Sequence, residues 1–140
     1  MIVIDSSALV EILAEKERAG PLRTVAESDV EWLVPEHFVL EVVSALREPW
    51  LGGHLERSTF EAAVSRVGAL PLDVWPSKPL LPRIVELAAN ATPHDAAYVA
   101  LAERLDAPLL TADHKLSRMP GIRCRVLPAT GRRGAYLQRP

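Results

Sequence analysis

Four acidic residues stand where their carboxylates could act together, namely Asp5, Glu41, Asp95 and Asp113. Asp5 directly follows the apolar run at residues 2–4, and Asp113 follows the short run Leu109-Leu110-Thr111. Continuous runs of this kind are typical of strands buried in a parallel sheet. The carboxyl ends of such strands meet at one edge, where sites form. The sequence therefore predicts that Asp5 and Asp113 lie at the functional edge of a sheet.

The other two acids are predicted on helices. Glu41 lies inside the apolar helical stretch 38–47 and shares a narrow polar stripe with His37, Ser44 and Glu48, at spacings of one helical turn. Asp95 opens a helix after Thr92-Pro93, where Thr suits the N-cap and Pro suits the first helical position.

Each acid also has a purely structural interpretation. Asp5, Asp95 and Asp113 all suit helix N-termini, and Glu41 suits an ion pair on its helix. The combination favours a shared site, because crowded carboxylates repel one another unless a cation or bound protons neutralise them. Oxygen ligands without cysteines or a paired-histidine motif favour Mg²⁺ or Mn²⁺ over zinc, and magnesium accompanies phosphate chemistry.

Short strands that alternate with helices predict an α/β fold with a parallel sheet covered on both faces. We expect strands at residues 2–4, 32–34, 70–75 and 109–111, and a half-exposed edge strand at 122–126. We expect helices near 9–13, 22–28, 38–47, 82–90 and 93–105, and one that starts with a capping box at 58–61. Pro49 is predicted to end the third helix, and Pro71 to restrict its strand to an edge or to lie at the start of a strand.

The composition fits one globular domain of 140 residues, with 49% hydrophobic and 24% charged residues. Cys124 is the only cysteine, which excludes an internal disulfide and fits a reducing, cytoplasmic setting. No apolar run reaches the roughly 20 residues of a membrane span. The N-terminus reads as a strand and not as a signal peptide.

The net charge of −2 hides an asymmetry. Residues 1–113 hold 9 basic and 18 acidic residues, a net charge of −9, whereas residues 114–140 hold 7 basic residues and no acid. A basic segment beside an acidic body predicts contact with a polyanion. We expect Lys115 and Arg118, close behind Asp113, to bind phosphates. For the later arginines the alternative of a solvated tail stays open; these are Arg132, Arg133 and Arg139.

Four stretches together resemble a known family. They are Ile2-Val3-Ile4-Asp5-Ser6-Ser7-Ala8, then residues 41–47, then 94–102, and finally 109–116. In this order they resemble PIN-domain ribonucleases and, more narrowly, VapC-type toxins of prokaryotic toxin–antitoxin pairs. The resemblance spans nearly the whole chain.

The resemblance implies a PIN-like three-layer α/β/α fold with a central twisted parallel sheet of four to five short strands. The corresponding domain is 1–127, followed by a basic C-terminal tail at 128–140. It also implies hydrolysis of RNA, a homodimer and inhibition by a cognate antitoxin. One or two Mg²⁺ or Mn²⁺ ions are then held by the four acids, and Ser6 and Thr111 match the hydroxyl positions beside them.

Other functions compete with this interpretation. A structure-specific DNA nuclease would use the same site, and only the resemblance favours RNA. A catalytically inert protein-binding module is disfavoured, because buried unpaired carboxylates are costly without a metal. A phosphoaspartate receiver needs an early acidic pair, whereas Ser6-Ser7 follow Asp5 here.

An apolar surface beyond the needs of one sheet face predicts a partner. We expect part of it to form a groove for an amphipathic antitoxin helix. The alternative is that all of it is core. The residues are Leu9, Val10, Ile12 and Leu13, with Phe60, Val64 and Val67.

Overall fold

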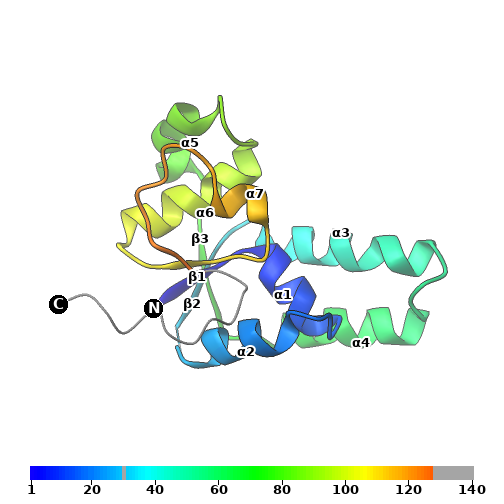
Figure 1. Cartoon of the computed structure of the whole chain (residues 1–140). Helices are drawn as coiled ribbons and strands as arrows, with labels where there is room; N and C mark the ends of the chain where they lie inside the picture. The colour runs from blue at the N-terminus through cyan, green and yellow to red at the C-terminus, as the bar shows by residue number, and fades with distance from the viewer. Residues whose placement is uncertain (30, 128–140) are drawn as a thin grey trace.

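The computed structural model describes residues 1–29 and 31–127, which form a parallel sheet between helices (Figure 1). The five strands of the described part are all paired in parallel, in the order β3-β2-β1-β4-β5. They are β1 (Ile2–Ile4), β2 (Trp32–Pro35), β3 (Leu72–Trp75), β4 (Leu109–Leu110) and β5 (Val126–Leu127). The helices are α1 (Ser6–Leu13), α2 (Ala19–Glu27), α3 (Phe38–Leu51), α4 (Arg57–Gly68), η1 (Lys78–Leu80), α5 (Leu81–Leu87), α6 (Pro93–Arg104) and α7 (His114–Ser117).

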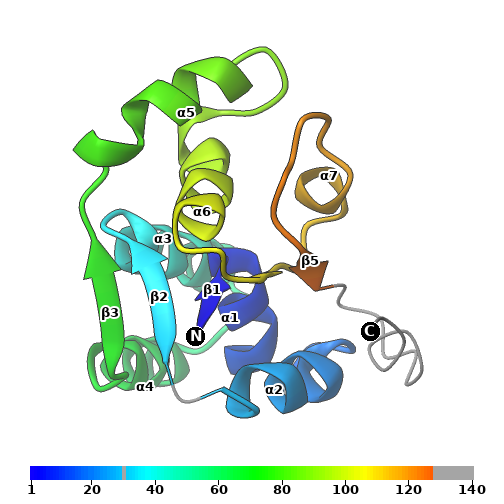
Figure 2. The same cartoon turned by 90° about the vertical axis from the view of Figure 1, so that its left-hand side faces the viewer.

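The helices cover both faces of the sheet, which confirms the predicted three-layer α/β/α fold. Figures 1 and 2 show α5, α6 and α7 on one side, and α1 and α2 on the other. Helix α6 packs directly on β1, β2 and β4. Helices α3 and α4 form a packed antiparallel pair that extends sideways from the sheet. No helix in the described part of the chain is long and apolar enough to cross a membrane.

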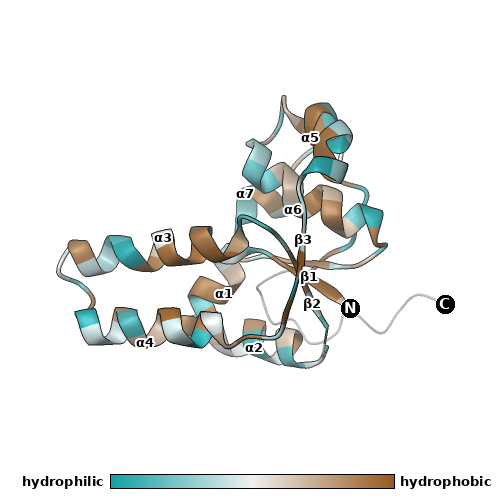
Figure 3. Ribbon diagram, turned by 180° about the vertical axis from the view of Figure 1, so that it is seen from behind, coloured by the Kyte–Doolittle hydropathy of each residue, from teal (hydrophilic) through white to brown (hydrophobic). Residues whose placement is uncertain are grey.

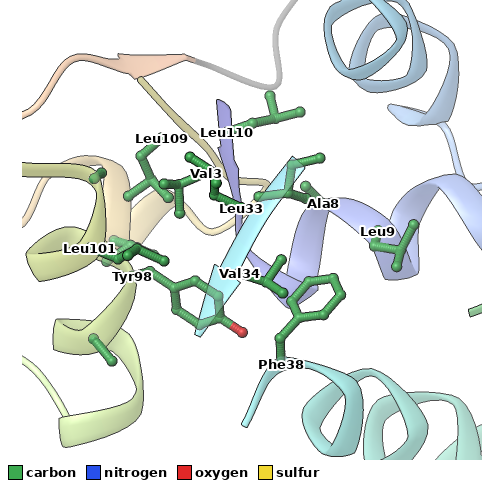
Figure 4. Packing of buried hydrophobic residues seen from close by; sticks show 14 of the residues in the cluster. Val3, Ala8, Leu9, Leu33, Val34, Phe38, Tyr98, Leu101, Leu109 and Leu110 are labelled. Atoms are coloured by element: carbon green, nitrogen blue, oxygen red, sulfur yellow. The ribbon is translucent and has the colours of Figure 1, made fainter. Parts of the chain in front are cut away.

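The core forms around the middle strand β1, all three of whose residues are buried. Figure 4 shows Val3, Leu33 and Leu109 close together, with Leu101 of α6 on one side and Phe38 of α3 on another. Figure 3 shows β1 among the hydrophobic segments, while α3 and α4 carry both hydrophobic and hydrophilic stretches. The continuous apolar runs of the sequence therefore correspond to strands covered on both faces.

Several local predictions are confirmed. The strand predicted near 70–75 is the edge strand β3, and Pro71 precedes it without entering the ladder. Thr92 is the N-cap of α6, because its Oγ1 accepts a hydrogen bond from the backbone N–H of Asp95 at 3.2 Å. Pro93 occupies the first position of that helix, where no backbone donor is needed.

The prediction that Pro49 ends α3 is wrong, since the helix continues to Leu51. Pro49 lies in the last turn, so it removes only one backbone donor near the end of the helix. The chain then turns by other bonds: Gly52 N–H donates to the carbonyl of Glu48, and His54 N–H donates to the carbonyl of Pro49.

Two helix starts also differ from the predictions. The capping box at 58–61 does not form, because α4 begins at Arg57 and Glu61 pairs with Arg57 Nε at 2.8 Å. Helix α2 begins at Ala19 and not at Leu22, because Gly20-Pro21 occupy its first turn, which tolerates proline.

The edge strand predicted at 122–126 starts only at Val126 and ends at Leu127. Glu103 of α6 explains this, because its Oε1 accepts the backbone N–H of Arg123 at 2.7 Å and draws the segment onto the helix. The predicted alternation persists, since Arg123 and Arg125 are exposed and Cys124 is half-buried. The predictions for the tail at 128–140, with its arginines, concern residues outside the described ones.

Candidate active site

Asp5 is the most buried of the four acids, with an exposed fraction of 4%. It directly follows β1 in the middle of the sheet. Its Oδ2 accepts hydrogen bonds from the hydroxyls of Ser7 at 2.5 Å and Thr111 at 2.6 Å. Burial raises the pKa of Asp5, the two hydroxyls oppose that shift, and the negative charges of Glu41 and Asp95 add to it. The edge of the sheet thus holds a carboxylate whose ionised form is destabilised.

Ser6 connects the first two acids. Its Oγ lies 3.0 Å from Oε1 of Glu41 and 3.4 Å from Oδ1 of Asp5. A hydroxyl has one proton to donate, so only one carboxylate receives it at a time. Because Asp5 and Glu41 compete for this one donor, the Ser6 hydroxyl can stabilise the negative charge of only one of them at a time.

Glu41 lies in the first turn of α3, and two hydroxyls reach the same oxygen of its carboxylate. Tyr98 of α6 donates its phenolic O–H to Oε1 at 3.0 Å, where Ser6 also points. Burial and the charges of Glu41 and Asp5 raise the pKa of Tyr98, so its phenol stays protonated and remains a donor. Figure 4 shows the Tyr98 ring in the core, with its hydroxyl at one end.

His37 tests the alternative that Glu41 is simply half of an ion pair. Its Nε2 lies 3.6 Å from Oε2 of Glu41, beyond hydrogen-bond distance, and is buried without a hydrogen-bond partner among the described residues. Burial lowers the pKa of His37, which favours the neutral imidazole. The ion pair is therefore weak, and Oε2 of Glu41 remains available.

Asp95 and Asp113 approach the pair from two further elements. Asp95 lies in the first turn of α6, where its charge contributes to the raised pKa of Asp5. Asp113 caps α7, and its Oδ1 accepts the backbone N–H of Lys115 at 2.8 Å. Its own N–H donates to Oγ1 of Thr111, whose hydroxyl donates to Asp5. The capping interpretation thus holds for Asp113, and the same bonds connect it to Asp5.

The chemistry of this donor set fits a hard divalent cation. Within residues 1–29 and 31–127, no Lys or Arg forms an ion pair with any of the four acids. Carboxylate oxygens are the ligands that Mg²⁺ and Mn²⁺ prefer, and a cation would relieve the repulsion that raises the pKa of Asp5. The four acidic side chains do not, however, converge on one point. Among residues 1–29 and 31–127, no three acidic, histidine or cysteine side chains lie close enough together to hold a metal ion in this conformation.

Lys115 and Arg118 lie beside this edge, on α7 and at its C-cap. Both side chains are exposed. Helix α7 ends at Ser117, so Arg118 lies at its C-cap, but both residues still follow Asp113 closely.

Ser7, Tyr98 and His37 also line the acids, although the sequence assigned none of them a site role. Ser7 has a signal in the sequence, because its hydroxyl adjoins Asp5 and Ser6 in the run Asp5-Ser6-Ser7. Tyr98 has a signal as well, because its hydroxyl is the one polar side-chain group in the buried run 96–102 of α6, one turn after Asp95. His37 has a signal too, because it shares the polar stripe of Glu41 one helical turn away, whereas its ring contact with Tyr98 arises only where the start of α3 meets α6.

Comparison with known proteins agrees with this geometry. The PIN-domain family model matches residues 2–122. Ribonuclease VapC12 of Mycobacterium tuberculosis is 36% identical over 127 residues, which cover 90% of this chain and 97% of that protein. Ribonuclease VapC1 of the same organism is 36% identical over 129 residues, covering 89% of this chain and 94% of the relative.

Solved structures share the fold at lower identity. Mycobacterium tuberculosis VapC20, described as a Sarcin-Ricin loop cleaving toxin, aligns with a TM-score of 0.64 at 16% identity, covering 84% of this chain and 93% of that one. VapBC2 from Rickettsia felis, solved with a DNA fragment from its promoter, aligns with a TM-score of 0.64 at 13% identity, covering 91% and 98%. The chain therefore belongs to the PIN-domain family and, within it, to the VapC proteins.

The raised pKa of Asp5 predicts a pH-dependent stability that Asp5→Asn removes. A carboxyl group whose pKa is higher in the folded state destabilises that state as pH rises from the ordinary value of 3.8 through the raised value. In EDTA, the melting temperature of Asp5→Asn should equal or exceed that of the unsubstituted protein, and the difference should grow as pH rises from 4 to 7. The exposed Asp73→Asn is the control. A variant that is less stable at every pH would show that Asp5 serves the fold as an anion.

Proposed function

We propose that this chain is a metal-dependent endoribonuclease that hydrolyses RNA phosphodiester bonds as the toxin of a toxin–antitoxin pair. The observation that carries the proposal is the edge at β1, where Ser6 touches both Asp5 and Glu41 and no Lys or Arg of the described residues pairs with either acid. The ribonuclease names of relatives at 36% identity over most of the chain support RNA as the substrate.

Asp5, Glu41, Asp95 and Asp113 are the residues that would hold Mg²⁺, or Mn²⁺ in its place. A bound divalent cation supplies positive charge that offsets the acids and the scissile phosphate, and makes water easier to deprotonate. Ser6, Ser7 and Thr111 orient carboxylate oxygens through their hydroxyls. Tyr98 fixes Oε1 of Glu41, which leaves Oε2 toward His37 as the freer oxygen.

Lys115 and Arg118 would bind RNA phosphates outside the acidic centre. The acids themselves repel a polyanion, so cations at the rim of the site are needed to bring the backbone close. Their exposure on α7, directly behind Asp113, suits that task. A single cysteine, half-buried Cys124, fits action in the reducing cytoplasm.

An apolar groove between α1, α3 and α4 would receive the antitoxin. It has a volume of about 590 Å³, and its apolar walls include Val10, Leu13, Leu46, Pro49, Leu55 and Ala63. Leu9 and Ile12, predicted to belong to this surface, are buried in the core instead, and so is Val67. Solved neighbours of the same fold include a toxin–antitoxin complex from Klebsiella pneumoniae, which supports a protein segment as the occupant.

The homodimer implied by the family resemblance is part of the same proposal. Leu81 and Val85, one turn apart on α5, are 50% and 71% exposed and offer apolar surface outside the groove. A DNA nuclease on the same site remains the competing function, and the first experiment below separates the two.

Removing single acids should abolish cleavage while the fold survives. We expect Asp95→Asn and Glu41→Gln each to lose most activity on labelled single-stranded RNA in Mg²⁺, with far-UV circular dichroism unchanged. Unsubstituted protein should be inactive in EDTA, active again in Mn²⁺, and much weaker on DNA of the same sequence. The exposed Asp73→Asn serves as the control and should keep full activity. Unreduced cleavage by either site variant contradicts the assignment, and preferential cleavage of DNA favours the competing nuclease.

Replacing both Lys115 and Arg118 by alanine should weaken RNA binding more than cleavage. Each lost phosphate contact should lower the slope of log affinity against log salt concentration by about 0.7 on single strands. Binding is measured in EDTA to prevent cleavage, and turnover is measured with saturating RNA in Mg²⁺. The exposed pair Arg123 and Arg125 provides a control double variant of equal charge. An unchanged salt slope would assign Lys115 and Arg118 to a solvated surface.

A charge placed in the groove should prevent antitoxin binding without affecting RNA cleavage. We expect the chain to co-purify with the product of the adjacent small open reading frame, and Leu13→Glu to abolish this, because an unpaired carboxylate is costly in an apolar contact. Val74→Glu, on an exposed apolar residue of β3 outside the groove, is the control. Co-purification that survives Leu13→Glu, or that is lost equally in Val74→Glu, would place the antitoxin elsewhere.

A further inference from the structure

Arg18 connects the turn between α1 and α2 to the loop that carries Asp113. Its Nη1 donates to the carbonyl oxygen of Ala112 at 2.8 Å and lies 3.4 Å from Nε2 of His114. These are the residues on either side of Asp113, and they are 94 and 96 positions away along the chain. The side chain is partly buried, with 31% of its surface exposed.

The bond to Ala112 fixes one particular peptide group. The carbonyl of Ala112 and the N–H of Asp113 belong to the same planar unit. Arg18 holds the oxygen of this unit, while Oγ1 of Thr111 accepts its N–H at 3.0 Å. The preceding N–H, that of Ala112, donates to Oγ of Ser7. Rotation of the unit would swing the Asp113 side chain, so the two bonds together determine where that carboxylate lies.

Glu11 holds the guanidinium in place. Its Oε1 accepts from Nη2 of Arg18 at 3.0 Å, and the Glu11 side chain is only 14% exposed. Glu11 belongs to α1, the helix that starts immediately after Asp5. The planar guanidinium can donate in both directions at once, which a lysine ammonium on a flexible stem does less well. The two hydrogen bonds of Arg18, to Glu11 and to Ala112, therefore fix the Asp113 loop relative to the helix that follows Asp5.

Other contacts of Asp113 do not replace this link. The bond from Lys115 N–H to Oδ1 lies within α7 itself and would move with the loop. The described contacts that cross to another element come from Ser7 and Thr111 on one side and from Arg18 on the other. Without Arg18, the loop keeps its internal bonds but loses the contact that orients the peptide before Asp113.

We propose that Arg18 is a positioning residue for the cleavage reaction, acting through the peptide between Ala112 and Asp113. The proposal rests on the function proposed above, in which Asp113 helps to hold the cation. Arg18 does not touch the substrate. It holds the loop that carries Asp113 against α1, the helix that follows Asp5, and its loss lowers turnover and leaves RNA affinity unchanged.

The test compares Arg18→Ala and Arg18→Lys with the control Arg57→Ala. Arg57 also pairs with a glutamate, Glu61, but on the exposed surface of α4, with its side chain 72% exposed. In Arg18→Ala without metal or RNA, exchange of the Asp113 amide proton, followed by NMR, should quicken about tenfold, as expected for loosening one hydrogen bond, because this proton belongs to the peptide that Arg18 holds and donates to Oγ1 of Thr111. Turnover at saturating RNA and Mg²⁺ should fall by about 10- to 100-fold, the size of effect expected from a displaced group, while KM stays constant. Arg18→Lys, which keeps the charge, should lie between, and Arg57→Ala should match the unsubstituted protein.

The outcomes separate this proposal from the proposed function. A raised KM with unchanged amide exchange would mean that Arg18 binds RNA directly, which overturns positioning. Quickened exchange with normal turnover would also overturn it, because the loop would then be irrelevant to the reaction. If the unsubstituted protein cleaves no RNA, the proposed function fails, and the exchange measurement still decides whether Arg18 holds the loop. Should Arg18→Ala not fold, Arg18→Lys alone carries the same comparison.

Discussion

The burial of Asp5 is the constraint around which the site is arranged. A carboxylate with 4% exposure has lost most of its hydration, and Glu41 and Asp95 add negative charge beside it. Hydroxyl groups supply what the lost water would have given: Ser7 and Thr111 donate to one oxygen, and Ser6 lies within reach of the other. Hydroxyls offset part of the cost of burial without cancelling the charge, because they bring no positive charge of their own. The negative potential that would attract a cation therefore persists.

The topology explains why the acids lie where they do. From β1 the chain builds outward to β2 and β3 on one side, and returns to add β4 and β5 on the other. In open parallel sheets, a strand at which the order reverses is bordered by connections that leave toward opposite faces, and ligands bind in the crevice between them. Asp5 follows that strand, Glu41 follows its neighbour β2 at the start of α3, and Asp113 follows its other neighbour β4. Asp95 comes from α6, the helix that packs on all three strands.

Sequence patterns predict this arrangement only as far as local chemistry determines it. Apolar runs identify the central strands, because strands buried on both faces have no polar residues to interrupt them, and Thr92-Pro93 marks a helix start through bonds within one turn. Pro49 was misleading because its effect depends on its position within the last turn of α3. The edge strand was overextended because a side chain from α6, Glu103, competes for its backbone. The four acids are predicted from local patterns, whereas the hydrogen bonds of Tyr98 to Glu41 and of Arg18 to Ala112 span 57 and 94 residues of the chain, which no local pattern encodes.

The burial of Asp5 also explains why lysines and arginines are kept apart from the four acids. A lysine or arginine paired directly with Asp5 or Glu41 would lower the pKa of the acid, but it would also occupy the oxygens and remove the attraction for an exchangeable cation. The Arg18 guanidinium bonds to Glu11 and to the backbone carbonyl of Ala112, and so orients the Asp113 loop without pairing with the Asp113 carboxylate. Lys115 and Arg118 stay exposed at the rim, where their attraction for a polyanion is retained. Positively charged side chains thus lie close to the four acids without pairing with them. Arg18 bonds to Glu11 and to a backbone carbonyl, and Lys115 and Arg118 are exposed to solvent.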